Sequence, residues 1–194
     1  ILYAGQHNLT VLKAGIIVGS GSSSFEIIRD LCEKLPIMVT PKWVLTKSQP
    51  IAIRDVMKCL LGAAGREDCY NQSFDIGGAD ILTYKEMLLN YAKVRKIKLS
   101  IYVLPIFSPK LSSYWLYFVT STSYKLAVNL VDSMSMEVVC NDQRLQQLLG
   151  LTPLGYEESI ALAFKKIEQN LVISSWKDSL SSSQFGTDLT GYIE

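Results

Sequence analysis

A loop of glycine and serine, residues 19–24, joins an apolar segment at residues 9–18 to a helical pattern. In open α/β sheets, ligands bind at loops of this kind, between the carboxyl end of a strand and the following helix. Glycine lets a ligand approach the backbone closely, and a helix N-terminus attracts anions. The loop is therefore either a ligand-binding loop or an ordinary strand-to-helix connection.

Histidine and cysteine, the side chains most used for metal binding and nucleophilic chemistry, are few in this chain. The one histidine, His7, cannot form a multi-histidine metal site, and it would have to be the base of any Ser-His-Asp triad. We expect His7 to lie in an exposed loop, and we expect no metal site. No Cys-x-x-Cys pair is present, so we expect free structural thiols in a reducing, cytoplasmic compartment. The cysteines are Cys32, Cys59, Cys69 and Cys140.

The bulk composition is that of a globular domain rather than a nucleic-acid-binding or disordered chain. The 194 residues are 48% hydrophobic, which is enough to bury one sizeable core. Net charge is +1, so the sequence does not predict a nucleic-acid partner. The densest basic group spans residues 93–98 near the end of a predicted helix, where cations are favoured. A solvated helix end is the first interpretation of this group, and a phosphate-binding patch is the second.

The most apolar region, residues 99–124, does not predict a membrane span. Pro105, Pro109 and Lys110 interrupt it, and its uncharged run at 111–124 is shorter than the ~20 residues that a span requires. We expect a buried strand followed by a buried helix that starts at Pro109 or Ser112. Aromatic residues at 114–118 leave membrane-surface or partner docking as an alternative.

Hydrophobic periodicity predicts alternating strands and helices, the pattern of an α/β fold. Residues 9–18 are apolar on both faces, as in a parallel strand covered on both sides. Two capping boxes, Ser23 with Glu26 and Thr83 with Glu86, predict helix starts, and Pro36 and Gly65 predict helix ends. Short strands are expected at 38–40, 73–76 and 99–104, polar connections at 43–48 and 65–72, and helices at 24–35, 55–64, 83–94, 144–149 (capped by Asp142) and 156–170. The predicted inward positions are Ile27, Ile28, Leu31, Leu35, Val56, Leu60, Leu61, Ala64, Met87, Leu88, Tyr91, Val94, Ile160, Phe164 and Ile167.

Three segments in a fixed order suggest a family. They are residues 13–21 (KAGIIVGSG), residues 50–56 (PIAIRDV), and residues 74–78 (FDIGG) before the capped helix at Thr83. Together they resemble the second half of an extended or atypical short-chain dehydrogenase/reductase (SDR). More closely, they are similar to the nucleoside-diphosphate-sugar-epimerase-like, NmrA-like NAD(P)-binding proteins. The resemblance covers roughly residues 1–170.

This resemblance implies a partial Rossmann-type sheet end at 1–36 and a smaller α+β substrate-side lobe at 37–170. The Ser-rich composition of residues 171–194 predicts a linker or tail. The resemblance also implies NAD or NADP as cofactor, bound mainly by residues upstream, with Asp55 as a structural brace. The Gly77-Gly78 pair is interpreted as a tight turn, with a phosphate cradle as the alternative. The residues expected beside the nicotinamide are Ala14, Gly15, Ile16 and Ile17. The residues expected to bind an unidentified small-molecule substrate are Gly19, Ser20, Trp43 and Gln49.

Two hallmarks of the family are absent from this sequence. No Gly-rich pyrophosphate fingerprint follows a first strand, and no tyrosine has lysine four residues later, Tyr91 with Arg95 being nearest. We therefore expect a C-terminal part of a longer polypeptide that has no catalytic residue of its own and is inactive alone. A non-catalytic cofactor-sensing or protein-interaction module is the alternative. The sheet edge at 9–18 would then be covered by self-association into a homo-oligomer or by rearranged helices.

Overall fold

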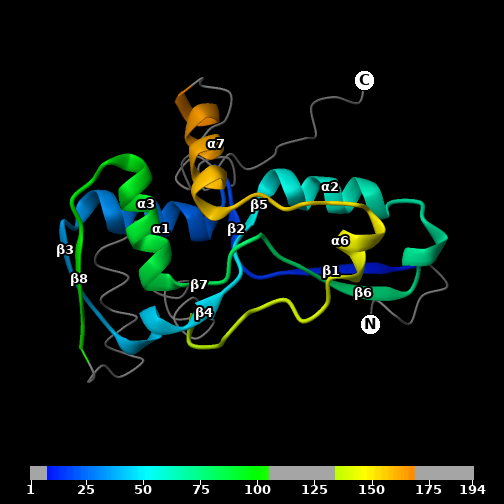
Figure 1. Ribbon diagram of the computed structural model, residues 1–194, viewed down its shortest axis with the longest axis horizontal. Helices are drawn as coiled ribbons and strands as arrows, with labels where there is room; N and C mark the ends of the chain where they lie inside the picture. The colour runs from blue at the N-terminus through cyan, green and yellow to red at the C-terminus, as the bar shows by residue number, and fades with distance from the viewer. Residues whose placement is uncertain (1–7, 105–133, 169–194) are drawn as a thin grey trace, which may run out of the picture.

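The computed structural model describes residues 8–104 and 134–168 (Figure 1). Short strand pairs with helices packed over them make an α/β fold, as the hydrophobic periodicity predicts. The first half of the described chain contains β1 (Thr10–Ala14), β2 (Ile17–Val18), α1 (Ser23–Lys34), β3 (Ile37–Thr40), η2 (Lys42–Leu45), β4 (Lys47–Ser48), β5 (Ile51–Ala52) and α2 (Ile53–Ala63). The second half contains η3 (Glu67–Cys69), β6 (Gln72–Ile76), β7 (Leu82–Thr83), α3 (Tyr84–Arg95), β8 (Ser100–Val103), α6 (Arg144–Leu148) and α7 (Tyr156–Glu168).

Three of the four strand pairs are parallel. β1 pairs with β6 from Thr10 opposite Gln72 to Ala14 opposite Ile76, β2 pairs with β5, and β3 pairs with β8. The single strand predicted at residues 9–18 is therefore wrong. The chain leaves β6 at Gly15 and continues beside β5, because β6 ends at Ile76 and Gly15 packs against Val138.

Helix α1 starts and ends as expected, but not with the predicted cap. Ser22 is the N-cap residue, and its hydroxyl donates to the Ile17 carbonyl oxygen (2.6 Å) instead of capping the helix. The Glu26 carboxylate accepts from the Gly21 N–H (3.4 Å) rather than from Ser23. The predicted capping box at Ser23 is thus wrong, because Ser22 is the N-cap residue and the Glu26 carboxylate binds the Gly21 N–H in the preceding loop. The inward positions at 27, 28 and 31 are buried as predicted.

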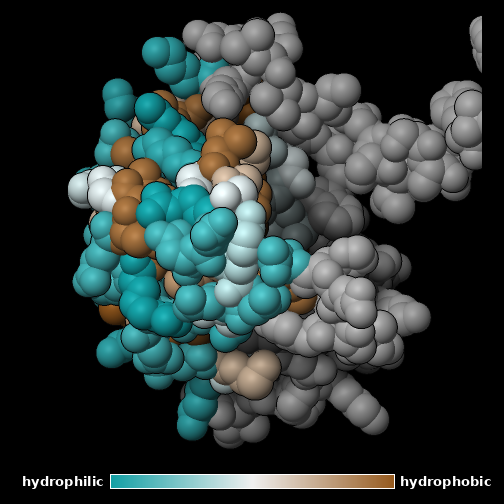
Figure 2. Space-filling model, turned by 90° about the vertical axis from the view of Figure 1, so that its right-hand side faces the viewer, coloured by the Kyte–Doolittle hydropathy of each residue, from teal (hydrophilic) through white to brown (hydrophobic). Residues whose placement is uncertain are grey.

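Helix α2 turns a different face to the core from the one predicted. It starts at Ile53, and its buried positions include Val56, Cys59 and Ala63. Leu60 and Leu61 are 47% and 73% exposed and Ala64 is also exposed, so the inward placement of these three residues is wrong. Figure 2 views the end of the molecule where α2, α6, β1 and β6 lie, and hydrophobic side chains reach that surface among hydrophilic ones.

The larger hydrophobic cluster lies between α1, α3 and α7. The capping box at Thr83 is confirmed: Thr83 Oγ1 accepts from the Glu86 N–H, and the Glu86 carboxylate accepts from the Thr83 N–H. Three aromatic rings meet in this cluster, with centroids 5.7 Å apart for the Phe25–Phe164 and Tyr91–Phe164 pairs. The other predicted inward residues there are buried or partly buried, namely Leu35, Met87, Leu88, Val94, Ile160 and Ile167.

A second cluster fills the space between α2, α6 and the β1–β6 pair. It contains Ile51, Val56, Phe74, Ile76 and Leu145. Both clusters combine residues from before and after position 36, because α1 packs on α3 and β1 pairs with β6. The segment before residue 36 and the segment after it therefore share both hydrophobic clusters, and their parallel strands lie side by side.

Several segments predicted as polar connections are more ordered than expected. The region 43–48 contains η2 and β4, with Trp43 and Val44 buried, so its interpretation as a polar connection is wrong. The loop at 65–72 includes η3 and the buried Cys69. Asp142 lies one residue before the N-cap of α6, where its carboxylate accepts from the Arg144 N–H (3.0 Å).

The predicted aromatic helix, His7 and the tail at 171–194 lie outside the described residues. Within the described residues, no helix is long and apolar enough to cross a membrane. The basic group at 93–98 lies at the end of α3, where Lys93 contacts Glu157 (2.7 Å) and the Arg95 guanidinium lies over the Phe164 ring (4.0 Å). These contacts fit a helix end better than a phosphate-binding patch.

Candidate functional site

The parallel strands β2 and β5 end side by side, and each continues into a helix. β2 leads through the loop 19–22 into α1, and β5 leads directly into α2. Helix α7 packs against both strands (Figure 1). A cavity of about 280 Å³ opens at these carboxyl ends, the position where α/β proteins bind ligands. Its lining consists of Val18, Gly19, Ser20, Ala52, Ile53, Arg54, Ser159, Leu162 and Ala163.

The loop beside this cavity depends on two glycines. A Cβ atom on Gly19 would lie 2.6 Å from the Ile53 Cγ2 atom, so only glycine lets the two strand ends approach this closely. Gly21 has φ +82°, a left-handed conformation that glycine adopts without strain. Burial raises the pKa of Glu26, and nearby Arg29 and the Gly21 N–H partly offset this shift. Glu26 contacts the loop by accepting from the Gly21 N–H and does not line the cavity.

The cavity is mostly apolar, and its polar side chains are those of Ser20, Arg54 and Ser159. Ser159 is already committed, because its hydroxyl donates to the Gly155 carbonyl oxygen (2.7 Å). Asp55 is buried and turned elsewhere: its carboxylate accepts from the Leu154 N–H (2.8 Å) and contacts Lys58 Nζ (2.8 Å). Asp55 braces α2 to the segment before α7, which agrees with the structural role that the resemblance implies.

The four residues predicted to lie beside a nicotinamide run from the end of β1 into β2. Ala14 closes the β1–β6 ladder opposite Ile76, and Gly15 packs against Val138. The Ile16 carbonyl oxygen accepts from the Ile51 N–H (2.8 Å), and the Ile17 carbonyl oxygen accepts from the Ser22 hydroxyl. The structure keeps these residues in one bend at the strand ends, and their cofactor contact stays a prediction.

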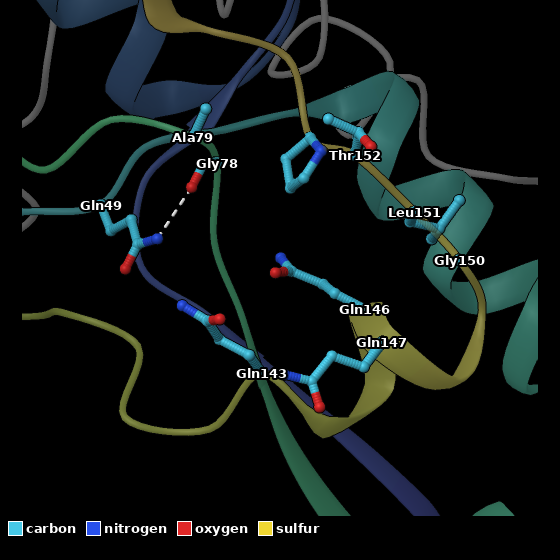
Figure 3. A pocket seen from close by; sticks show the side chains of 10 residues that line it. Gln49, Gly78, Ala79, Gln143, Gln146, Gln147, Gly150, Leu151 and Thr152 are labelled. Carbon is cyan, nitrogen blue, oxygen red and sulfur yellow. Dashed lines mark hydrogen bonds between the residues drawn. The ribbon is translucent and has the colours of Figure 1, made fainter.

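Gln49 lies at a second cavity, of about 480 Å³, shown in Figure 3. It is only 8% exposed, and both ends of its amide are occupied. Its Nε2 donates to the Gly78 carbonyl oxygen (2.8 Å), and its Oε1 accepts from the Cys140 N–H (3.0 Å). Gln146 similarly donates to the Gly77 carbonyl oxygen (2.6 Å). These amides join segments of the fold and are not left free for a ligand.

The four predicted substrate residues therefore divide among three places. Gly19 and Ser20 line the 280 Å³ cavity, whereas Gln49 faces the other cavity. Trp43 lines neither and lies buried in the larger cluster, where its ring meets the Tyr84 ring edge-on at 5.7 Å. Arg54 and the α7 residues Ser159 and Leu162 also line this cavity, and the sequence pattern did not predict them. For Arg54, the available signal was its position directly after a short strand. For Ser159 and Leu162 there was no local signal, because α7 reaches the site through tertiary packing.

Gly77 and Gly78 are glycines because the chain is crowded there. A Cβ atom on Gly78 would overlap the Pro50 carbonyl oxygen, and one on Gly77 would lie 2.6 Å from the Cys140 sulfur. Neither glycine has a positive φ. Close packing of β6 against the start of β5, rather than phosphate binding, accounts for this pair.

The cysteines show no sign of metal binding or nucleophilic activation. All four are free thiols; Cys32, Cys59 and Cys69 are buried. Burial raises the pKa of the Cys32 thiol to about 12 and that of Cys140 to about 11. Across residues 8–104 and 134–168, no group of three or more His, Cys, Asp and Glu side chains could hold a metal ion.

Comparison with known proteins identifies the fold. No family model matches the chain, and no curated protein matches it. Among solved structures, it is similar to a nucleoside-diphosphate-sugar epimerase from Staphylococcus aureus (10% identity, TM-score 0.61), over 82% of this chain and 54% of that one. It is also similar to the Citrobacter triphenylmethane reductase complexed with NADP(H) (14% identity, TM-score 0.58), over 80% and 53% of the two chains.

A third similar structure is an NADPH-dependent quinone oxidoreductase from Escherichia coli (15% identity, TM-score 0.58), over 71% of this chain and 49% of that one. These are the groups of proteins that the sequence motifs suggest, and the likeness shows that the chain has an SDR-like, Rossmann-type fold. The chain spans about half the length of each of these structures.

Proposed function

We propose that this chain is the substrate-side part of an NAD(P)-dependent, SDR-like oxidoreductase or sugar-nucleotide epimerase-like protein. The observation that supports this most is the cavity at the carboxyl ends of β2 and β5, which Gly19 and Ser20 line. It lies in a fold shared with NAD(P)-dependent proteins. The bend at residues 14–17 leads directly into the wall of this cavity.

In this proposal the chain positions a substrate, and the cofactor supplies hydride chemistry when bound. Residues 14–17 would present backbone groups to the nicotinamide, and the lack of a side chain at Gly15 lets this bend pack against Val138. Ser20 would orient the substrate by hydrogen bonding, while Val18 and Leu162 exclude water from it. The pyrophosphate-binding loop and the proton-transferring pair would come from residues outside the 194 described by this sequence.

A non-catalytic cofactor-sensing module is the second candidate, and one observation favours it. Among the described residues that line the cavity, there is no Asp, Glu, His, Tyr or Lys that could transfer a proton. A protein that keeps the fold and senses a nucleotide needs no such group. The two candidates differ in turnover: only the enzyme, in a longer chain, converts a substrate, either with net oxidation of NAD(P)H as an oxidoreductase or with inversion of a sugar carbon as an epimerase.

Calorimetric titration with NAD(H) and NADP(H) tests the shared part of the proposal. It compares this chain with a version extended at its N-terminus. Binding by the extended chain alone supports a nucleotide site shared between the two parts. Absence of binding by both would overturn the proposed function.

Four free cysteines further support the cytoplasmic location that we include in this proposal.

A further inference from the structure

The cavity at the ends of β2 and β5 combines an apolar floor with one cation at its mouth. Val18, Ala52 and Ala163 are buried, and Leu162 completes the apolar wall. Among the described residues that line it, Arg54 alone is charged, and its side chain is exposed. Such a site favours a ligand with an apolar body and a polar or charged end.

Arg54 differs from every other arginine in the chain. Among residues 8–104 and 134–168, it has no partner for a hydrogen bond, ion pair or ring contact. The neighbouring Asp55 does not neutralise it, because that carboxylate is buried and engaged by Lys58 and the Leu154 N–H. The remaining four arginines contact a carboxylate or an aromatic ring: Arg29 with Glu26, Arg66 with Asp68, Arg144 with Asp142, and Arg95 with Phe164.

Ser20 adds a second uncommitted group to the same cavity. Its hydroxyl has no hydrogen-bond partner in the part of the chain that the structure describes, whereas the Ser159 hydroxyl donates to the Gly155 carbonyl oxygen. A guanidinium binds a carboxylate or phosphate through two parallel hydrogen bonds, and a hydroxyl can donate a third. The polar groups left free are therefore donors suited to an anion.

We propose that this cavity binds a small amphipathic anion, with its carboxylate or phosphate held by Arg54 and Ser20 and its apolar body against Val18, Ala52 and Leu162. A volume of about 280 Å³ limits the ligand to a small molecule. The claim that such an anion is the substrate rests on the proposed function. The claim that the cavity binds such an anion can be tested without any nucleotide.

Ligand-observed NMR titrations of the full chain provide the test. The probes are 4-phenylbutyrate and benzyl phosphate as anions, and 4-phenyl-1-butanol as the neutral match. At least one anion should bind at least ~10-fold more tightly than the alcohol, the contribution of one charge-assisted hydrogen bond. Added salt should reduce this preference, because the interaction is between opposite charges near the surface.

Arg54→Ala should remove the preference for the anion, and Arg54→Lys should retain part of it. Arg66→Ala is the matched control, since it deletes the same side chain at a solvent-exposed ion pair outside the cavity and should leave binding unchanged. Thermal melts confirm that each variant is folded. Equal affinity for anions and alcohol, or equal losses in Arg54→Ala and Arg66→Ala, would overturn the proposal. Anion binding without nucleotide binding would instead retain this site and refute only the proposed function.

Discussion

Replacing Gln49 with alanine should destabilise the fold rather than weaken ligand binding. The Gln49 amide holds the Gly78 carbonyl oxygen at 2.8 Å and the Cys140 N–H at 3.0 Å, and the side chain is buried. Each buried polar group left without a partner costs roughly 1–3 kcal/mol. The Gly78 carbonyl borders the 480 Å³ cavity, where water can reach it, so we expect a total near the lower end, about 2 kcal/mol.

Thermal unfolding followed by far-ultraviolet circular dichroism measures this cost. In a chain of this size about 2 kcal/mol lowers Tm by roughly 4–8 °C. Gln147→Ala is the matched control, because Gln147 lines the same cavity but is exposed, and its amide has no partner among the described residues. Gln147→Ala should change Tm little. If Gln49→Ala melts like Gln147→Ala while ligand affinity falls, Gln49 is a ligand-binding residue and this reasoning is refuted.

Three further predictions concern other local features. Gly78→Ala should lower the free energy of unfolding in urea by about 3 kcal/mol or more, because the new Cβ would overlap the Pro50 carbonyl oxygen. Gly155→Ala is the control: its Cβ would lie 3.3 Å from the Asp80 carboxylate, and its loss of stability should be less than half as large. Thr83→Ala should lower stability by about 1 kcal/mol through loss of the N-cap, and Thr83→Ser should restore most of it in the same assay. Burial, reinforced by Asp75 and Asp142, raises the pKa of Cys140 to about 11. A disulfide reagent should therefore modify Cys140 about tenfold more slowly at pH 8 than it modifies an ordinary thiol. This figure allows for the greater nucleophilicity of a thiolate with a higher pKa. Because only the thiolate reacts, the rate for Cys140 should continue to rise between pH 9 and pH 10, and a plateau near pH 9 would contradict the shift.

Local signals in the sequence predicted the elements that depend on local contacts. The capping box at Thr83 formed because both of its hydrogen bonds join residues three apart. The similar pattern at Ser23 failed because Ser22 found a partner in β2 and Glu26 found one in the loop. Hydrophobicity alone placed Leu60 and Leu61 inside, but α6 and β6 lie on the side of α2 that carries Cys59.

In the candidate site, too, the residues that depend on local order along the chain could be predicted, and those that depend on tertiary packing could not. Gly19 and Ser20 follow from the order strand, loop, helix, which needs no tertiary information. Arg54 and Leu162 enter the site only because β5 pairs with β2 and α7 packs on both. A glutamine such as Gln49 can bind a ligand or join two backbone segments, and its sequence context does not distinguish these roles.

Nucleotide titration of this chain and of an N-terminally extended version tests the central claim most directly. Calorimetry should detect NAD(H) or NADP(H) binding to the extended chain and none to residues 1–194 alone. That result agrees with a chain that supplies the nicotinamide-adjacent bend and the substrate cavity but not the pyrophosphate loop. Tight binding to residues 1–194 alone would contradict the account, because it would mean that this chain contains a complete nucleotide site.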